Sequence, residues 1–599
     1  MVNVYRKDID GLRAIAIISV ILFHLGYLPN GYLGVDVFFV ISGFLITGII
    51  YKEIENKNFR IINFYESRIR RIVPLLLFTT ITTFLFGILF MIPDDLENLC
   101  QSIFATNLFA NNFLMKLTTA DYWASNNEYK PLMHTWSLSI EEQFYILYPL
   151  IFIFFKRNAI KYIILFLSFI SISFFFISND VSSKFYFIQY RFFELSMGGI
   201  FNIFFLNQIA VYKYLKNIYI LFLLYILIIF LLISPKNNYN DLNIIAITLI
   251  TSLVLVMGSI QHEKNYTYKL LFTNKFIVSI GKISFSLYLW HQIVFAFSKY
   301  VLFEQITNTN SALLFLFIVF LSFLSYNYIE MPFRDKKFIK SKTLFPIIII
   351  TYIIIIFSSL YIYMIGGIIK DIPSLDLVKP QKVSELNIFN RRNNIHNRYN
   401  DNVRKFDMPF SSNYNNEIYK KPIKILVIGN SYARDLSNIL LESDFIDSIE
   451  LRYTDKNFKT DKSLIDKIKK SDFVFYGSDY PVLGEIIKLK IDIRKIWIFG
   501  IKDFGNTNGV HFNKKIFDYK TYRTPMKYGI KELNLKEKNI WKDRYIDIID
   551  IISDGNNNVL VFTPDGKFIS QDTYHLTKYG SIFLASLLNN KFRQILKIN

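Results

Sequence analysis

The chain has 599 residues, of which 52% are hydrophobic and 17% aromatic, and its formal net charge is +20. This apolar composition is atypical of a soluble globular protein of such length. It predicts a polytopic membrane protein with the lipid bilayer as its partner. The single cysteine, Cys100, excludes an internal disulfide and a thiolate metal cluster, and we expect no metal site. The positive charge accompanies no nucleic-acid-binding motif, so we expect no nucleic acid partner.

Eleven apolar segments of a length that crosses a bilayer follow one another from the N-terminus. We place them near residues 10–28, 35–51, 74–92, 143–156, 159–178, 188–206, 217–234, 242–260, 281–299, 310–328 and 344–367. No small-x-small cleavage site follows the first segment, so we expect it to be retained. Lysine and arginine gather in the short loops on the side of the N-terminus, as in loop 52–73, which predicts a cytoplasmic N-terminus.

This count divides the chain into four parts. A ten-helix membrane domain is predicted over residues 1–340, followed by an eleventh helix within 341–367. Residues 368–421 are polar and weakly patterned, which indicates a linker. Because the number of crossings is odd, residues 422–599 are predicted to be extracytoplasmic.

Four short apolar runs alternate with amphipathic stretches in the last part of the chain. They are residues 424–429, 473–477, 495–500 and 559–563. Buried parallel strands have this pattern, and the stretches between them are typical of helices. The sequence therefore predicts a three-layer α/β domain over residues 422–599.

The first apolar segment carries Arg13 and His24, eleven positions apart. At 3.6 residues per turn they share one helix face, about 16 Å apart along the axis. Ionisable groups inside a membrane span are costly and are usually functional, so we interpret them as the two ends of a path through the bilayer. The alternative is a membrane anchor in which Arg13 reaches the headgroups and His24 lies at the far interface.

Charged residues flank both ends of this path. Asp36 is predicted at the depth of His24, where a carboxylate would orient the imidazole and raise its basicity; the alternative is a helix cap. Arg68 and Arg71 lie about one turn apart on the cytoplasmic side near Arg13, and arginines there suit an anion that carries phosphates. The alternative is that these arginines only set the membrane orientation.

Further polar residues lie within or beside later apolar segments, where we expect them to belong to a membrane site. They are His134, Glu142, Arg191, Glu194 and His291. Arg191 and Glu194 are about one turn apart and predict a buried ion pair. His291 is predicted about 15 Å inside its helix, a depth at which an imidazole is seldom incidental.

Seven motifs, in order over residues 5–335, resemble the acyltransferase-3 family of integral membrane acyltransferases. They are DGLRAIAIISVILFH, GVDVFFVISGFLI, FYESRIRRIVP, HTWSLSIEEQFYILYP, RFFELSMGG, ISFSLYLWHQ and YIEMPFR. The resemblance implies an acyl-CoA donor on the cytoplasmic side and a glycan or lipid acceptor. It also implies that Arg13 is functional and that His24 is the acyl-transfer base, and Arg68 and Arg71 match the family's Arg-x-x-Arg.

A second set of candidates lies in the predicted α/β domain. The segment KILVIGNSYARDL, residues 424–436, places Ser431 at a strand-to-helix turn, where backbone N–H groups gather. Asp572 and His575 lie three residues apart, just before the last predicted helix. A serine nucleophile needs a base and a group that orients the base, so these three residues predict a catalytic set. The alternative is that Ser431 is an ordinary helix cap.

This arrangement resembles the SGNH hydrolase family over about residues 422–595. The chain departs from the family pattern at Asn430, where Asp is common, and we expect altered support around Ser431 rather than loss of function. The resemblance also implies oxyanion-stabilising positions. Gly477 and Asn506 are our candidates for them, with Asn508 as the alternative to Asn506.

The two resemblances together imply a bacterial inner-membrane O-acyltransferase. It would move an acyl group, expected to be acetyl, from cytoplasmic acetyl-CoA to a hydroxyl of an extracytoplasmic glycan. Proteins that resemble this fusion O-acetylate lipopolysaccharide, other surface polysaccharides or peptidoglycan. One alternative is a glycan O-acyl esterase, and another is a non-enzymatic transporter or sensor, because buried charges also mark transport paths.

Overall fold

The computed structural model describes residues 5–118, 128–205, 218–234, 241–258, 266–302, 308–365, 422–455, 464–477, 483–488, 491–505, 520–527, 529–570 and 574–598. By its contacts the chain divides into two units. The first comprises Met1–Gly87, Leu99–Lys299 and Glu304–Leu360, and the second comprises Ile88–Asn98, Tyr300–Phe303 and Tyr361–Asn599. The predicted linker, residues 368–421, lies outside the described residues.

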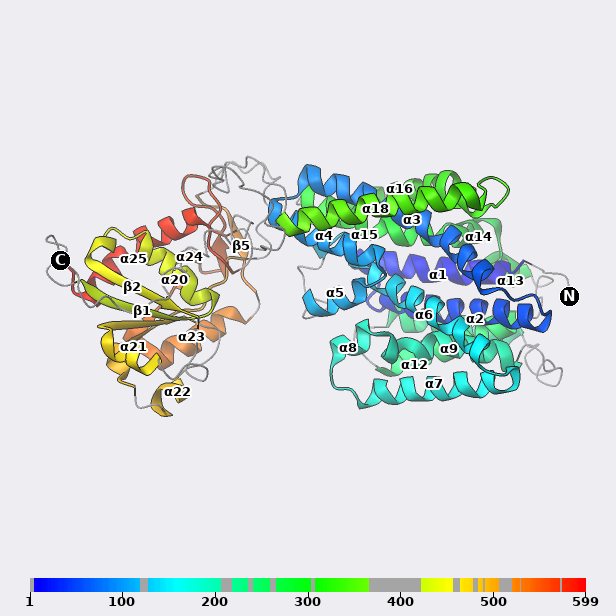
Figure 1. The fold of residues 1–599 in the computed structure, drawn as a ribbon, viewed down its shortest axis with the longest axis horizontal. Helices are drawn as coiled ribbons and strands as arrows, with labels where there is room; N and C mark the ends of the chain where they lie inside the picture. The colour runs from blue at the N-terminus through cyan, green and yellow to red at the C-terminus, as the bar shows by residue number, and fades with distance from the viewer. Residues whose placement is uncertain are drawn as a thin grey trace. The chain divides into compact units, whose positions relative to one another are not determined.

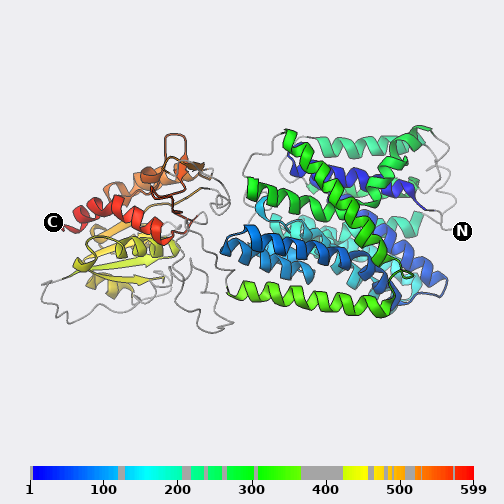
Figure 2. The ribbon, with the colours of Figure 1, turned by 90° about the horizontal axis from the view of Figure 1, so that it is seen from above.

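A long helix coincides with each of the eleven predicted apolar segments, and Figures 1 and 2 show these helices running alongside one another. They are α1 (Lys7–His24), α2 (Gly34–Glu55), α3 (Ile61–Phe90), α6 (Thr135–Phe154), α7 (Arg157–Ile177), α9 (Ile188–Phe205), α11 (Ile218–Ile233), α12 (Asp241–Gly258), α15 (Ser284–Leu302), α16 (Asn308–Ser325) and α18 (Ser341–Ile365). Shorter helices connect them: α4 (Pro93–Asn107), α5 (Asn111–Thr118), α8 (Val181–Tyr186), α13 (Tyr266–Phe272), α14 (Lys275–Lys282) and α17 (Met331–Arg334).

Six helical stretches among the described residues are long and apolar enough to cross a membrane. They are Gly31–Glu55, Ile61–Phe90, Arg157–Ile177, Asp241–Gly258, Thr309–Arg334 and Ser341–Ile365. The chain is therefore built as a multi-pass membrane protein, and the count of eleven crossings stays a prediction. Two helices begin well before the apolar segments predicted for them. α3 begins at Ile61 rather than near residue 74, and α6 begins at Thr135 rather than near residue 143, where the polar stretch is buried and helical.

Helices α2 and α9 pack with their backbones in contact. A Cβ added at Gly43 would lie 1.6 Å from the carbonyl oxygen of Leu195, and one at Gly198 would lie 2.1 Å from that of Val40. Small residues permit this approach between membrane helices. The contact holds the polar side chains of α2 beside those of α9.

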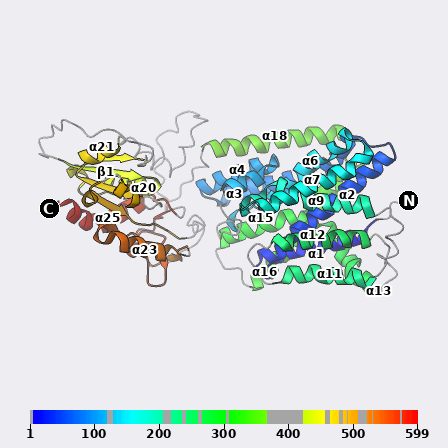
Figure 3. The ribbon, with the colours of Figure 1, turned by 90° about the horizontal axis from the view of Figure 1, so that it is seen from below.

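The second unit contains a parallel sheet, which includes the strand labelled β1 in Figure 3. Its strands lie in the order β2-β1-β3-β4-β6. The strands are β1 (Ile423–Gly429), β2 (Ile449–Thr454), β3 (Phe473–Gly477), β4 (Ile496–Phe499) and β6 (Tyr545–Ile546). The helices are α20 (Ser431–Leu441), α21 (Leu464–Lys470), α22 (Leu483–Lys488), α23 (Ile530–Trp541), α24 (Ile549–Ile552) and α25 (Lys578–Leu596).

Alternate side chains of β1 enter two separate cores. Ile425 and Val427 pack with α20 and α25, whereas Leu426 and Ile428 pack with α21 and α22, as Figure 1 shows for the helices on either face. Successive strand residues point to opposite faces of a sheet, so both faces are covered. The predicted three-layer α/β architecture is therefore present in the second unit.

The predicted strand at residues 559–563 is wrong in extent and in place. Only Asn558–Leu560 forms a strand, β7, and it pairs antiparallel with β5 (Arg523–Pro525) outside the parallel sheet. Edge strands β2 and β6 were not predicted. β2 carries Glu450 and Arg452, which bond to each other at 2.6 Å and break the apolar pattern, and β6 has only two residues.

Candidate active site

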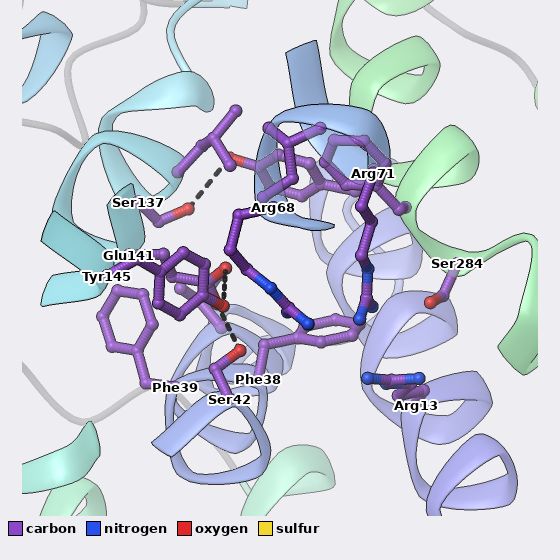
Figure 4. Close-up of a pocket in the computed structure, with 15 residues that line it drawn as sticks. Arg13, Phe38, Phe39, Ser42, Arg68, Arg71, Ser137, Glu141, Tyr145 and Ser284 are labelled. Atoms are coloured by element: carbon purple, nitrogen blue, oxygen red, sulfur yellow. Dashed lines mark hydrogen bonds between the residues drawn. The ribbon is translucent and has the colours of Figure 1, made fainter. Parts of the chain in front are cut away.

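A cavity with a volume of about 80 Å³ gathers three arginines in the helical unit. Arg13 enters it from α1, and Arg68 and Arg71 enter from α3; Figure 4 shows their guanidinium groups close together. Arg68 and Arg71 share one face of α3 because they are three residues apart. Aromatic residues of α2 and polar residues of α6 and α15 complete the wall.

The arginines of α3 differ in their partners. Arg70 is fully buried and satisfied: its Nε donates to Glu66 at 2.8 Å, and its terminal nitrogens donate to Ile339 O at 2.9 Å and to Ser341 Oγ at 3.0 Å. Among the described residues, no carboxylate forms an ion pair with Arg68 or Arg71, and the buried Nε of Arg68 has no hydrogen-bond partner. Arg70 is therefore structural, whereas the other two leave positive charge available.

The cavity is lined by one carboxylate, Glu141, which accepts hydrogen bonds from Ser42 at 3.1 Å and Tyr145 at 3.3 Å. Arg13 bonds weakly to Asp10, at 3.3 Å. Three half-buried guanidinium groups against one lining carboxylate leave a surplus of positive charge, which favours an anionic ligand. Glu142, which the sequence analysis assigns to a membrane site, is buried on α6 but does not line this cavity, whereas its neighbour Glu141 does.

A second, smaller cavity, of about 10 Å³, lies around His24 at the end of α1. His134, which precedes α6, also lines it. His291 of α15 contacts both rings, tilted against one and edge-on to the other: its ring centroid lies 5.2 Å from that of His24 and 5.1 Å from that of His134. Three of the seven histidines in the chain therefore meet at one place.

The protonation of His291 follows from its contacts. Its Nδ1 lies 2.6 Å from the carbonyl oxygen of Tyr288 and 3.2 Å from that of Leu287. A carbonyl only accepts hydrogen bonds, so Nδ1 carries the proton and Nε2 presents a lone pair. This Nε2 is buried without a hydrogen-bond partner among the described residues. The backbone thus holds the imidazole in the form that can accept a proton.

Asp36 lines the cavity of His24, but its carboxylate does not bond to the imidazole as predicted. It accepts a hydrogen bond from Arg191 at 2.7 Å, and Arg191 also pairs with Glu194 at 2.5 Å. The predicted ion pair between Arg191 and Glu194 is confirmed. Asp36 is its third member because the close α2–α9 contact brings a guanidinium, a stronger partner than an imidazole, beside it.

In the second unit, Ser431 is the first residue of α20 and directly follows the end of β1. Asn430 caps the helix, its side chain accepting from the N–H of Tyr432 at 3.1 Å. Gly429 has φ = +136°, and a Cβ there would lie 2.0 Å from the carbonyl oxygen of Gly477, at the end of β3. The predicted turn is present, and Gly477 lies beside the first turn of α20.

A buried ion pair that the sequence did not suggest connects this turn to the segment of His575. Asp435 of α20 pairs with Lys502, and both side chains are fully buried. Asp435 also accepts from the N–H of Leu576 at 3.2 Å, and Lys502 donates to Ser431 O at 3.3 Å. The structure thereby ties the residue after His575 to the helix that begins with Ser431.

Two predicted residues of this set, Asp572 and Asn506, lie outside the described residues, as does Asn508. Asp503 lies three residues before Asn506. Burial raises the pKa of its carboxyl, which accepts a hydrogen bond from the N–H of Gly505 at 2.8 Å. Among the described residues no group of three metal-ligating side chains lies close enough to hold a metal ion.

Known proteins match about half of this chain. A protein of Staphylococcus aureus strain MSSA476, SAS0844, which carries a provisional O-acetyltransferase name, is 32% identical over 366 residues, covering 55% of this chain and 58% of that protein. O-acetyltransferase OatA of S. aureus strain NCTC 8325 / PS 47 is 30% identical over 375 residues, covering 56% of this chain and 58% of OatA. The match thus spans less than two thirds of each relative. No solved structure matches the chain.

The family comparison covers the residues that form both cavities. The model of the acyltransferase-3 family, described as an acyltransferase domain, matches residues 6–326, more than half of the chain. This range contains α1 with Arg13 and His24 as well as the arginines of α3 and the histidine of α15. The chain therefore belongs to the acyltransferase-3 family.

Proposed function

We propose that the protein is a membrane O-acyltransferase. It takes an acyl group, acetyl in the first instance, from cytoplasmic acyl-CoA and delivers it to a hydroxyl of an extracytoplasmic glycan. The observation that carries the proposal is that one helix, α1, presents Arg13 to an arginine-rich cavity and His24 to an adjacent cavity that His134 also lines, with the ring of His291 in contact with both imidazoles. The O-acetyltransferase names of the relatives support the same reaction class.

The arginine cavity supports a donor that carries phosphates. Arg68 and Arg71 offer planar, permanently charged groups that no described carboxylate neutralises, and such groups bind phosphate oxygens through paired hydrogen bonds. The apolar wall from Phe38 and Phe39 suits the less polar part of the donor. On this proposal the arginines hold the anionic end, and the acyl end points toward His24.

The histidine cavity supports proton transfer during acyl transfer. His24 removes the proton of the attacking hydroxyl as its oxygen bonds to the acyl carbon, the carbon–sulfur bond breaks, and the thiol of CoA leaves with a proton. His291, whose buried Nε2 has no hydrogen-bond partner among the described residues, is available to accept a proton from its neighbour. Burial of the His134 and His291 side chains limits the access of water, which would otherwise hydrolyse the thioester.

We further propose that the second unit is an extracytoplasmic SGNH-like domain that completes the transfer. Ser431 Oγ attacks the carbonyl carbon of the ester formed in the membrane site, and His575 takes the serine proton. The ester C–O bond breaks, the departing alcohol receives that proton from His575, and Asp572 holds His575. The acyl-serine then passes its group to a glycan hydroxyl of lipopolysaccharide, another surface polysaccharide or peptidoglycan. A cytoplasmic N-terminus in a bacterial inner membrane fits this order, because the donor is inside and the acceptor outside.

The test is the O-acetyl content of purified surface polysaccharide, measured by NMR in cells with and without the protein and in cells that carry His24→Ala or Ser431→Ala. Loss of acetyl in the deletion and in both variants is the expected result. Loss with His24→Ala alone would reduce the second unit to an accessory part. A higher acetyl content in the deletion would overturn the proposal and favour the esterase alternative.

A further inference from the structure

Three residues line both cavities and therefore form the boundary between them: Val35 of α2, Ser137 of α6 and Tyr288 of α15. The hydroxyl oxygens of Ser137 and Tyr288 are hydrogen bonded at 2.9 Å, and the Tyr288 hydroxyl donates to the carbonyl of His134 at 2.5 Å. Since the tyrosine proton goes to that carbonyl, Ser137 is the donor in the pair. The bonded hydroxyls fix one side of the boundary, and Val35 forms the other.

The two cavities differ greatly in size. The arginine side has a volume of about 80 Å³, whereas the histidine side has about 10 Å³, which is room for about one water molecule. Bulky side chains occupy the rest of the histidine side: Val20, Phe23, Tyr32, Trp136 and Phe185. Only a group about the size of a methyl fits beyond the boundary without displacing this wall.

We propose that Val35, Ser137 and Tyr288 set the length of the acyl group that the enzyme accepts. The methyl of an acetyl group passes this boundary and reaches His24, and the boundary excludes longer acyl chains. This inference rests on the proposed function, because it assumes a donor held by the arginines with its acyl end toward His24. It assigns acyl selectivity to residues that take no part in the chemical step.

Val35 is the position at which the selectivity can be changed without touching a hydrogen bond. Its neighbour Val37 lies two residues away on the same helix, on a different face. Val37 is buried in an apolar core and lines neither cavity. Alanine at either position removes the same two methyl groups, so Val37→Ala controls for the general loss of packing.

The experiment uses the full chain in proteoliposomes and measures CoA thiol release from acetyl-, propionyl- and butyryl-CoA in the presence of acceptor glycan. The wild-type protein is expected to prefer acetyl over butyryl by at least about tenfold, the discrimination that small apolar pockets give. Val35→Ala is expected to raise the butyryl-to-acetyl rate ratio about tenfold, whereas Val37→Ala leaves the ratio at the wild-type value.

A second variant keeps the test decisive if Val35→Ala does not fold. Val35→Ile adds one methylene at the boundary and is expected to lower the propionyl-to-acetyl ratio. Equal wild-type rates for acetyl and butyryl, or ratios that neither variant changes, would overturn the inference while the proposed function stands. Absence of release from every acyl-CoA in the wild-type protein would instead contradict the proposed function.

Discussion

The imidazole rings of His24 and His291 lie 5.2 Å apart, although one belongs to α1 and the other to α15. His291 is the better fixed of the two, because two backbone carbonyls hold its Nδ1 proton and leave Nε2 as the acceptor. A base whose proton-accepting atom is set by the backbone is ready before substrate arrives. The two residues therefore have different positions. His24 lines the cavity, whereas His291 does not line it and packs against the ring of His24.

Replacing His291 with asparagine tests the role of Nε2 separately from that of Nδ1. The amide nitrogen of asparagine replaces Nδ1 as a donor to the Tyr288 carbonyl, but nothing replaces Nε2. We expect acyl transfer to fall about 100-fold or more, the effect of losing an acid–base group, with the thermal midpoint of the full chain unchanged. Full activity in His291→Asn would show that Nε2 has no part in the reaction.

Methionine at Arg68 and at Arg70 should have opposite effects on stability. Arg68→Met removes a half-buried charge that has no ion-pair partner among the described residues, so we expect an unchanged or higher thermal midpoint together with a higher KM for acetyl-CoA. Arg70→Met removes several hydrogen bonds, and we expect a lower midpoint.

The measurement for this pair is thermal unfolding in detergent with and without CoA. Added CoA should raise the midpoint of the wild-type protein and leave that of Arg68→Met almost unchanged, because a ligand stabilises only the form that binds it. An equal CoA-induced shift in both proteins would show that Arg68 does not contact the donor.

Breaking the ion pair between Asp435 and Lys502 should destabilise the second unit. Asp435→Asn leaves a buried ammonium without a counter-charge, which costs about 3–5 kcal/mol. The double variant Asp435→Leu/Lys502→Met removes both charges and is expected to recover most of that stability. Hydrogen exchange of β4 and α25 in the full chain measures both effects.

The double variant also tests whether the pair positions His575. It leaves the N–H of Leu576 without its acceptor, so we expect the Ser431-dependent reaction to stay slow even where stability returns. Recovery of activity along with stability would show that the pair has a structural role alone.

Asp547 should contribute stability that depends on pH. Burial opposes its ionisation, but hydrogen bonds from Lys538, from the N–H of Asp550 and from Asn534 outweigh burial and lower its pKa. A carboxyl with a lowered pKa stabilises the fold above its unfolded pKa of about 3.9 and loses that contribution as pH falls through the folded pKa.

Asp547→Asn is therefore expected to lower stability by about 1–3 kcal/mol at pH 7, the value of hydrogen bonds to a charged group. The difference from the wild-type protein should shrink below about pH 4. Calorimetry of the full chain at several pH values measures it. The exposed pair of Asp466 and Lys469, which are 3.9 Å apart, provides a control, because Asp466→Asn should leave the unfolding midpoint nearly unchanged at every pH.

The sequence predicts helices well here because an apolar segment of membrane length has few alternatives, and each of the eleven segments contains one. The sequence predicts poorly which side chains of different helices contact each other. Asp36 was expected beside His24, but a helix pattern gives depth along an axis and not which neighbouring helix lies opposite. Only the α2–α9 contact brings Arg191 within 2.7 Å of that carboxylate.

The grouping of His24, His134 and His291 shows the same limit. Each histidine stood out by itself as a polar residue in or beside an apolar segment. The three belong to segments far apart in the sequence, so their common location becomes visible only in the folded helical unit. The ion pair of Asp435 and Lys502 gave a weak signal: Asp435 lies four residues after Ser431, on the same helix face, in the motif already singled out.

The backbone contact at Gly43 and Gly198 has a mechanical consequence for the catalytic cycle. With a carbonyl oxygen against each glycine, α2 and α9 cannot slide or rotate past each other without a steric clash, so they behave as one rigid body. The α2 wall of both cavities is then stationary during turnover. Any widening that admits donor or releases CoA must come from displacement of α1, α3, α6 or α15, so probes placed across α2 and α9 should report a constant distance while probes across α2 and α15 report a changing one.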